Sequence, residues 1–136
     1  MRRITAFGVM LLGLVASIAS FAQADELDGA WATEPSACDK IFVQKQKRIS
    51  VASDSDAYGN GFIVEGDRIR GKVSNCRITH RKREGKFLTL IASCSSDIAL
   101  STVQFTLRLD GENVVTRLFP GMEGLEASYS RCPASR

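Results

Sequence analysis

Short segments in which apolar and polar residues alternate recur along most of the chain, whereas a helical repeat of apolar positions is poorly developed. Alternation with a period of two is the pattern of a strand with one buried face, because successive side chains of a strand point to opposite sides. The expected strands are residues 29–33, 48–52, 61–65, 68–74, 76–82, 87–93, 102–109, 113–119 and 126–131. Residues 35–40 are expected to form one helical turn, and residues 41–43 to lead back into the sheet.

The connections between these strands are mostly of hairpin length. Gly66-Asp67, Glu84-Gly85 and Asp110-Gly111-Glu112 supply residues that tolerate a positive φ. The pattern predicts an all-β fold: a single antiparallel up-and-down barrel of about eight strands, since closing the sheet removes exposed edges. A β-sandwich is the alternative.

The first 24 residues are predicted to be a cleaved signal peptide. Arg2 and Arg3 precede an uncharged, mostly apolar run over residues 6–18, and Ala22-Gln23-Ala24 has the small-x-small form of a cleavage site. No later run is apolar for long enough to be a transmembrane helix. Residues 25–136 are therefore expected to form one domain, located in the periplasm or secreted. Without Arg2 and Arg3, the chain's 18 basic and 15 acidic residues leave a net charge of +1.

The four cysteines predict two disulfides, because an even number in an exported chain is typical of a disulfide framework. No zinc site is expected, since the chain has no C-x-x-C pair and a single histidine. A hairpin turn centred on Gly85 places Cys76 opposite Cys94, and elimination gives Cys38–Cys132. The second bond is expected because the first and last strands of the barrel would end at the same rim. The alternative pairing is Cys38–Cys76 with Cys94–Cys132.

The same register predicts the orientation of the basic residues around this hairpin. Even positions, including Ile78, His80 and Leu90, would face the interior, and odd positions would face outward. In the preceding strand Ile69 and Val73 would face inward. The predicted outward row is Arg68, Arg70, Lys72, Arg77, Arg81 and Arg83.

This row gives the chain a segregated charge. Residues 67–86 carry eight Lys and Arg and two acids, whereas the rest of residues 25–136 has a net charge of −5. The partner expected for such a face is an acidic protein surface or an anionic envelope component such as a glycan or lipid. A solvated strand face that discourages edge pairing is the equally weighted alternative. No nucleic acid is expected, because no aromatic residues alternate with the charges.

Apolar residues also occur in two predicted loops at the barrel rim. Phe119 and Met122 lie in "LFPGMEGLE", and Ile98 and Leu100 lie in "SSDIALS". Such side chains either plug the end of a barrel or contact a partner, and Phe119 and Met122 are candidate partner-binding residues.

No catalytic residues, metal or cofactor are predicted. The cysteines are used in disulfides, there is no second histidine, and no Gly-x-Ser-x-Gly motif occurs. Residues 54–65 place Asp54, Asp56, Gly59 and Glu65 at EF-hand positions, but Tyr58 stands where a ligand oxygen is needed and the flanks are strands. A polar loop is the expected structure there.

Gly29-Ala30-Trp31 at the start of the first strand resembles the Gly-x-Trp entry of lipocalin-like barrels, including small exported bacterial barrels that inhibit proteases or lysozymes. The resemblance implies that Trp31 packs at one end of the barrel beneath an arginine of a late strand, either Arg131 or Arg117, in a cation–π contact. The expected function is that of a small exported binding protein, such as an inhibitor or interaction module for an envelope or secreted protein. The alternatives are a carrier of a small apolar ligand inside the barrel and a binder of anionic glycan or lipid.

Overall fold

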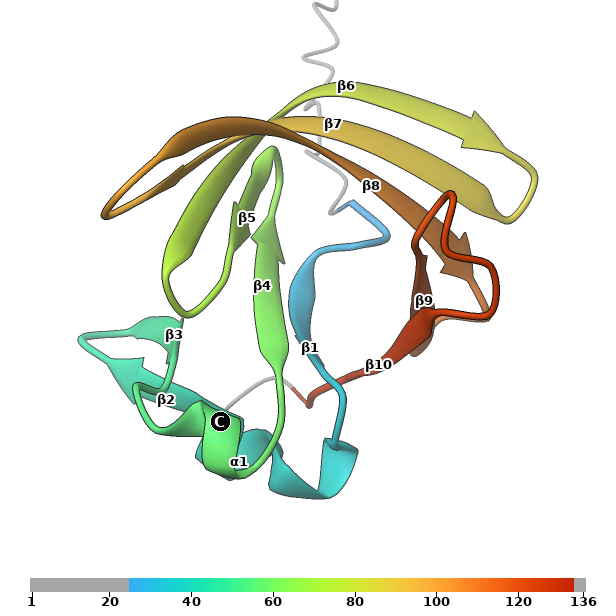
Figure 1. The fold of residues 1–136 in the computed structure, drawn as a ribbon. Coiled ribbons are helices and arrows are strands. Elements are labelled where there is room, and N and C mark those ends of the chain that lie inside the picture. Colours follow the sequence, from blue (N-terminus) through green and yellow to red (C-terminus); the bar gives the residue numbers. More distant parts are fainter. Residues whose placement is uncertain (1–24, 134–136) are drawn as a thin grey trace, which may run out of the picture.

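The computed structural model describes residues 25–133, so the predicted signal peptide lies outside the described residues. Eight strands form a closed antiparallel barrel in the order β1-β10-β9-β8-β7-β6-β5-β4 (Figure 1), which confirms the predicted all-β barrel rather than a sandwich. The barrel strands are β1 (Gly29–Ala32), β4 (Gly61–Glu65), β5 (Arg68–Arg70), β6 (Ser74–Glu84), β7 (Phe87–Ser96), β8 (Leu100–Leu109), β9 (Val114–Leu118) and β10 (Glu126–Arg131).

Between β1 and β4 the chain leaves the barrel. It forms the 3₁₀ helix η1 (Pro35–Ala37), the helix α1 (Cys38–Ile41), the hairpin of β2 (Phe42–Lys45) and β3 (Arg48–Val51), and the 3₁₀ helix η2 (Ser55–Ala57). The predicted strand 48–52 therefore pairs with β2 in a separate two-stranded sheet. We call residues 33–60 the outer subdomain.

Two hydrophobic cores share strand β1. Trp31 points into the barrel with Val64, Leu90 and Val115, all at most 1% exposed. Ala30 and Ala32 point the other way and pack with residues of the outer subdomain, which include Ile41 and Phe42. Because side chains alternate along a strand, β1 is apolar on both faces and links the two cores.

The loops of the barrel alternate between its two ends, as they must in an antiparallel meander. The connections β5–β6, β7–β8 and β9–β10 lie at one end, which we call the loop rim. The turns β4–β5, β6–β7 and β8–β9 lie at the other end, together with residues 25–28, which we call the N-terminal strap. The β7–β8 hairpin projects beyond the neighbouring strands at the left of Figure 1.

Both predicted disulfides are present, Cys76–Cys94 and Cys38–Cys132. The reason given above for the second bond is wrong, because β1 and β10 are antiparallel neighbours and end at opposite rims. Cys38 reaches Cys132 because the chain turns back through η1 and α1 along the outside of the barrel. There Cys132 is buried in the outer core and its N–H donates to the Ala30 carbonyl at 2.8 Å.

The β6–β7 register differs from the prediction by one residue near the turn. Gly85 and Lys86 form a two-residue turn, so Glu84 pairs with Phe87, and Gly85 adopts the left-handed φ of 59° that such turns require. A β-bulge between Ile78 and His80 then restores the predicted pairing of Ile78 with Ala92 and of Cys76 with Cys94. The correct disulfide thus results from two offsets that cancel.

Candidate functional site

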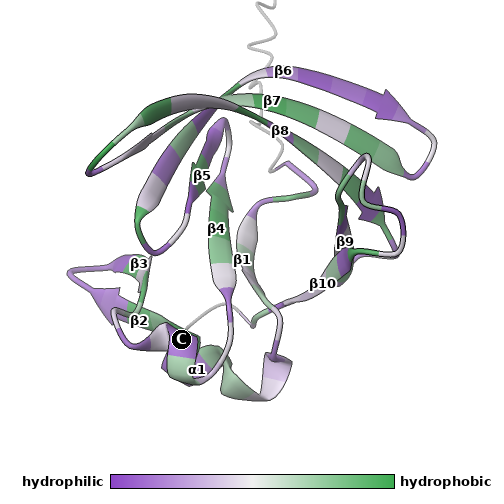
Figure 2. Ribbon diagram, in the orientation of Figure 1, coloured by the Kyte–Doolittle hydropathy of each residue, from purple (hydrophilic) through white to green (hydrophobic). Residues whose placement is uncertain are grey.

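The bulge reverses the orientation of the second half of β6. Arg81 and Arg83 lie opposite the buried Leu90 and Leu88, on the inner side of the strand, so their predicted outward orientation is wrong. His80, predicted to face inward, is exposed, and its Nδ1 lies 3.2 Å from the Thr79 hydroxyl. Figure 2 shows that this half of β6 is hydrophilic along its length, which leaves both faces compatible with water or charge.

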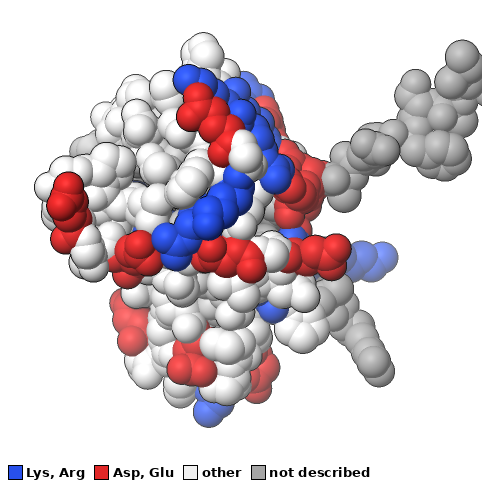
Figure 3. Space-filling model, turned by 90° about the vertical axis from the view of Figure 1, so that its right-hand side faces the viewer, with Lys and Arg blue, Asp and Glu red and all other residues white. Residues whose placement is uncertain are grey.

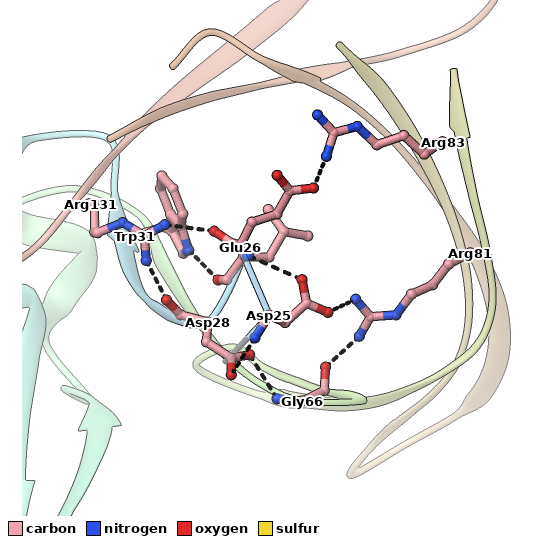
Figure 4. Close-up of polar contacts among 9 residues, drawn as sticks. Asp25, Glu26, Asp28, Trp31, Gly66, Arg81, Arg83 and Arg131 are labelled. Atoms are coloured by element: carbon pink, nitrogen blue, oxygen red, sulfur yellow. Dashed lines mark hydrogen bonds and ion pairs between the residues drawn. The ribbon is translucent and has the colours of Figure 1, made fainter. Parts of the chain in front are cut away.

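The two inward arginines bind the N-terminal strap. Arg81 pairs with Asp25 and Arg83 pairs with Glu26 (Figure 4). Asp28 Oδ1 accepts a hydrogen bond of 2.8 Å from the N–H of Gly66 in the β4–β5 turn, and Leu27 is buried in the inner core. The strap therefore closes one end of the barrel, with Leu27 inserted and acids facing the basic strand.

Arg131 fixes the strap from the opposite side. Its guanidinium carbon lies 4.2 Å from the centroid of the Trp31 ring, so the expected cation–π contact is made by Arg131. The same guanidinium donates to the carbonyls of Asp28, Glu26 and Glu112. Trp31 in turn donates its indole N–H to the Leu27 carbonyl at 2.8 Å. These residues are engaged in holding the strap (Figure 4).

Arg70 is also removed from the predicted basic face. It has the expected orientation on β5, but the β2–β3 hairpin covers the barrel exterior at this point and leaves Arg70 9% exposed. Its Nη1 donates to the Ile49 carbonyl at 2.9 Å and its Nη2 to Glu65 at 2.8 Å. Arg70 therefore joins the outer subdomain to the barrel.

The remaining basic candidates are accessible. Lys72 pairs with Asp56, and Arg77 lies 3.4 Å from Asp67. Arg68 is exposed and is the register neighbour of Arg77. On the side of the molecule seen in Figure 3, Lys and Arg form a narrow band with Asp and Glu beside it. The structure therefore breaks the predicted uninterrupted basic face into partly neutralised groups.

A polar network that the sequence did not predict covers the outside of β8, β9 and β10. Arg108 contacts Asp110 at 2.8 Å and Glu126 at 3.2 Å, and Thr116 donates to Asp110 at 2.6 Å. The hydrogen bond from Arg108, followed by that from Thr116, lowers the pKa of Asp110 below its ordinary value of 3.8. The carboxylates in turn raise the pKa of Arg108, above all through the hydrogen bond to Asp110.

The loop rim carries the most exposed apolar side chains. Of the eight large hydrophobic residues that are exposed among residues 25–133, five lie on this rim: Val73, Ile98, Leu100, Met122 and Leu125. Ile98 is 95% exposed, Leu100 83% and Val73 68%. Val73 does not face inward as predicted, because β5 ends at Arg70 and the loop carries Val73 out of the sheet.

Val73, Ile98 and Leu100 lie at neighbouring connections of the loop rim. Ser74 pairs with Ser96, so the β5–β6 connection that carries Val73 lies beside the β7–β8 turn. We call these three residues the apolar tip; Figure 2 shows hydrophobic colour at the end of the β7–β8 hairpin. Of the two predicted rim residues, Met122 is exposed, whereas Phe119 is half-buried with the Arg117 guanidinium 4.8 Å from its ring centroid.

The barrel interior holds a cavity of about 180 Å³. Its lining includes Leu27, Phe62, Leu90, Phe105, Arg117 and Tyr129. Phe62 and Tyr129 meet edge to face, with ring centroids 4.9 Å apart. The aromatic side chains thus fill the interior only in part.

Metal-binding residues are not brought together. Within residues 25–133 no group of three or more His, Cys, Asp or Glu side chains could hold a metal ion. Two of the residues that matched the EF-hand pattern bind side chains elsewhere, since Asp56 pairs with Lys72 and Glu65 with Arg70.

In the part of the chain that the structure describes, no helix has the length and apolarity needed to span a membrane. No protein-family description, curated protein sequence or solved structure matches the chain.

Proposed function

We propose that this protein is an exported, non-enzymatic protein-binding module that docks through its apolar tip. The observation that carries the proposal is the exposure of Ile98 and Leu100 at the end of a projecting hairpin (Figure 1). Exposed apolar side chains that gather on one feature of a protein mark an interaction site more often than scattered ones do. Two disulfides support export, because such bonds persist in oxidising compartments.

The backbone beside the tip supplies a second mode of contact. Strand β8 pairs with β9 only through Thr106–Leu109, so no described strand pairs with the other edge of residues 100–105. This edge carries no charged residue, and charges are the usual protection of an open edge. An extended segment of a partner can therefore add to β8 while Ile98 and Leu100 enter an apolar depression.

The shape of the site favours a concave partner surface, as in an inhibitor that inserts a hairpin into the cleft of an envelope or secreted hydrolase. The surroundings of the tip are polar but nearly uncharged, with Asp97 as the single charge in residues 95–101. Binding through the tip should therefore depend little on ionic strength, unlike docking through Arg68 and Arg77.

Site-specific photo-crosslinking in the cell envelope tests this proposal. A photoreactive residue at position 98 or 100 should form a discrete adduct with one partner, whereas the same residue at Ile91, an exposed position on β7 away from the tip, should not. In pull-downs, Ile98→Asp and Leu100→Asp should each lower capture of that partner about 10-fold or more, since loss of an interface anchor costs about 2 kcal/mol or more.

The matched controls are Ile91→Asp, which adds the same charge elsewhere, and the double variant Arg68→Glu/Arg77→Glu. If the arginine variant lost capture of the partner and Leu100→Asp kept it, the binding site would lie at Arg68 and Arg77 and not at the apolar tip. Charge reversal at Arg70, Arg81 or Arg83 is unsuitable as a test, because Arg70 binds the outer subdomain and Arg81 and Arg83 bind the acids of the strap.

A further inference from the structure

Arg117 differs from Arg81, Arg83 and Arg131 because no group of the described chain accepts a hydrogen bond from its guanidinium. It lies on β9 opposite the buried Leu107, and its guanidinium carbon is 4.8 Å from the ring centroids of both Phe105 and Phe119. Among residues 25–133 no carboxylate or carbonyl accepts a hydrogen bond from it, whereas Arg81 and Arg83 bind acids and Arg131 binds three carbonyls.

Tyr129 supplies a second polar group to the same cavity. It lies on β10 diagonally across from Arg117, since Tyr129 pairs with Val115 and Arg117 with Ala127. Diagonal neighbours on paired strands are about 7–8 Å apart, within reach of two long side chains. The Tyr129 hydroxyl makes no hydrogen bond with any residue of the described chain, and its ring packs against Phe62.

Arg117 and Tyr129 are each partly exposed, so water solvates their polar groups when the cavity is empty. The two aromatic rings contact the guanidinium through cation–π interactions but leave its N–H donors free to bind an anion in place of that water. The planar fork of an arginine matches a carboxylate, and a phenol can donate to the same group. The rest of the lining is mostly apolar, with Leu27, Val64 and Leu90 among its residues, and Asn60 and Ser74 are its other polar residues.

We propose that the barrel cavity binds a small organic carboxylate, with the carboxylate on Arg117 and Tyr129 and a compact apolar body directed toward Leu27 and Leu90. The volume of about 180 Å³ sets the size of the ligand. It is smaller than the roughly 300–1,000 Å³ of most drug-sized ligand pockets and corresponds to about six water molecules at roughly 30 Å³ each. This fits a single ring or a short branched chain and excludes a long-chain lipid.

The cavity and the apolar tip are different sites, so this proposal does not depend on the proposed docking function. The lining of the cavity includes Gly71 and Ser74, at the loop rim where β5 leads into β6. A small ligand entering at this rim would reach Arg117 before the apolar end of the cavity at Leu27, which leaves the carboxylate nearest to the solvent.

Amide-resolved NMR titration of the wild-type protein with benzoate tests the inference. Benzoate should bind saturably at millimolar concentrations and shift resonances of β8, β9 and β10 that line the cavity. Benzamide, which has the same shape without the charge, and benzylammonium, which has the opposite charge, should bind about 10- to 100-fold more weakly, as expected for one charge-assisted contact.

Arg117→Gln should lower the affinity for benzoate to that of the wild-type protein for benzamide. Tyr129→Phe should lower the affinity for benzoate by a smaller factor, without disturbing the packing of its ring against Phe62. Arg68→Gln removes an exposed arginine outside the cavity and should leave binding unchanged. Urea unfolding of each variant checks that the barrel is intact, and Tyr129→Phe provides the test if Arg117→Gln does not fold. Equal binding of benzoate and benzamide, absence of benzoate binding, or unchanged affinity in a folded Arg117→Gln or Tyr129→Phe protein would overturn the proposal.

Discussion

Individual charged residues in this protein act mainly on one another. Arg70 is buried by the outer subdomain, Arg81 and Arg83 hold the N-terminal strap, and Arg131 covers Trp31. A basic composition at the level of the sequence is therefore a poor guide to a basic surface. What distinguishes a candidate binding residue here is the absence of an internal partner, which marks Arg117 in the cavity.

At the residue scale, Asp110 should make stability depend on pH. Its pKa is lowered in the folded protein, so the stabilisation by Asp110 is present above the ordinary value of 3.8 and is lost as the pH falls through the lower folded pKa. Asp110→Asn should therefore lower the free energy of unfolding at pH 7, and its difference from wild type should shrink as the pH falls below about 4.

Urea unfolding from pH 7 to pH 2, followed by the fluorescence of the single tryptophan, measures this difference. Asp97→Asn is the control, because Asp97 lies in the exposed β7–β8 turn and has no ion pair among the described residues. A difference between Asp110→Asn and wild type that is constant over this range would contradict the assignment.

At the scale of elements, turn chemistry determines how well each hairpin is specified. Gly66 and Gly85 meet the positive φ of their turns without strain, both at 59°. The β2–β3 hairpin instead turns at Gln46 and Lys47, with φ of 51° and 65°. Two consecutive positive values are the mark of a type I′ turn, in which Asn-Gly is preferred.

The double variant Gln46→Asn/Lys47→Gly should therefore stabilise the protein by about 1 kcal/mol, because side chains other than glycine and asparagine are unfavourable in the left-handed region. The midpoint of urea unfolding should rise accordingly. Gln44→Asn/Lys45→Gly places the same residues within strand β2 and should destabilise. No gain from the first variant would mean that the hairpin does not unfold together with the barrel.

The elements were largely predictable from the sequence, and their faces were not. Alternation and turn residues located nearly all barrel strands, since both signals are local. The bulge at Thr79 and His80 was missed because this segment is polar on both sides, so its alternation contains no mark of the inserted residue. The strap was missed because its acids resemble a linker, although Leu27 provided a signal as the one apolar residue among them.

At the scale of the whole molecule, two disulfides connect parts with different roles. Cys76–Cys94 joins neighbouring strands within the inner core, whereas Cys38–Cys132 holds the outer subdomain against β1 and β10. The sequence supported these pairings without showing their geometry, since the outer subdomain depends on contacts between distant segments. The candidate site was predictable in the same partial way: Ile98 and Leu100 were recognised as rim residues, but only the projecting hairpin shows that they are exposed.

Removing each disulfide should have unequal effects. The loops closed by the bonds span 94 and 18 residues. Chain-entropy estimates give a loss of up to about 4.7 kcal/mol for the double variant Cys38→Ser/Cys132→Ser and about 3 kcal/mol for Cys76→Ser/Cys94→Ser. Urea unfolding under non-reducing conditions measures both losses, with the wild-type protein that holds both disulfides as reference. A larger loss from the second variant would contradict this order.

The bulge in β6 also has a consequence for how this chain can tolerate changes in length. Side chains of a strand alternate between its two faces, and the extra residue at Thr79 shifts this alternation for the residues between it and the Gly85 turn. Deleting Thr79 would remove the bulge and keep the other pairs of the ladder, with Arg81 opposite Leu90 and Arg83 opposite Leu88. The strand would therefore lose this one residue without exchanging its faces, and Asp25 and Glu26 would keep their cations.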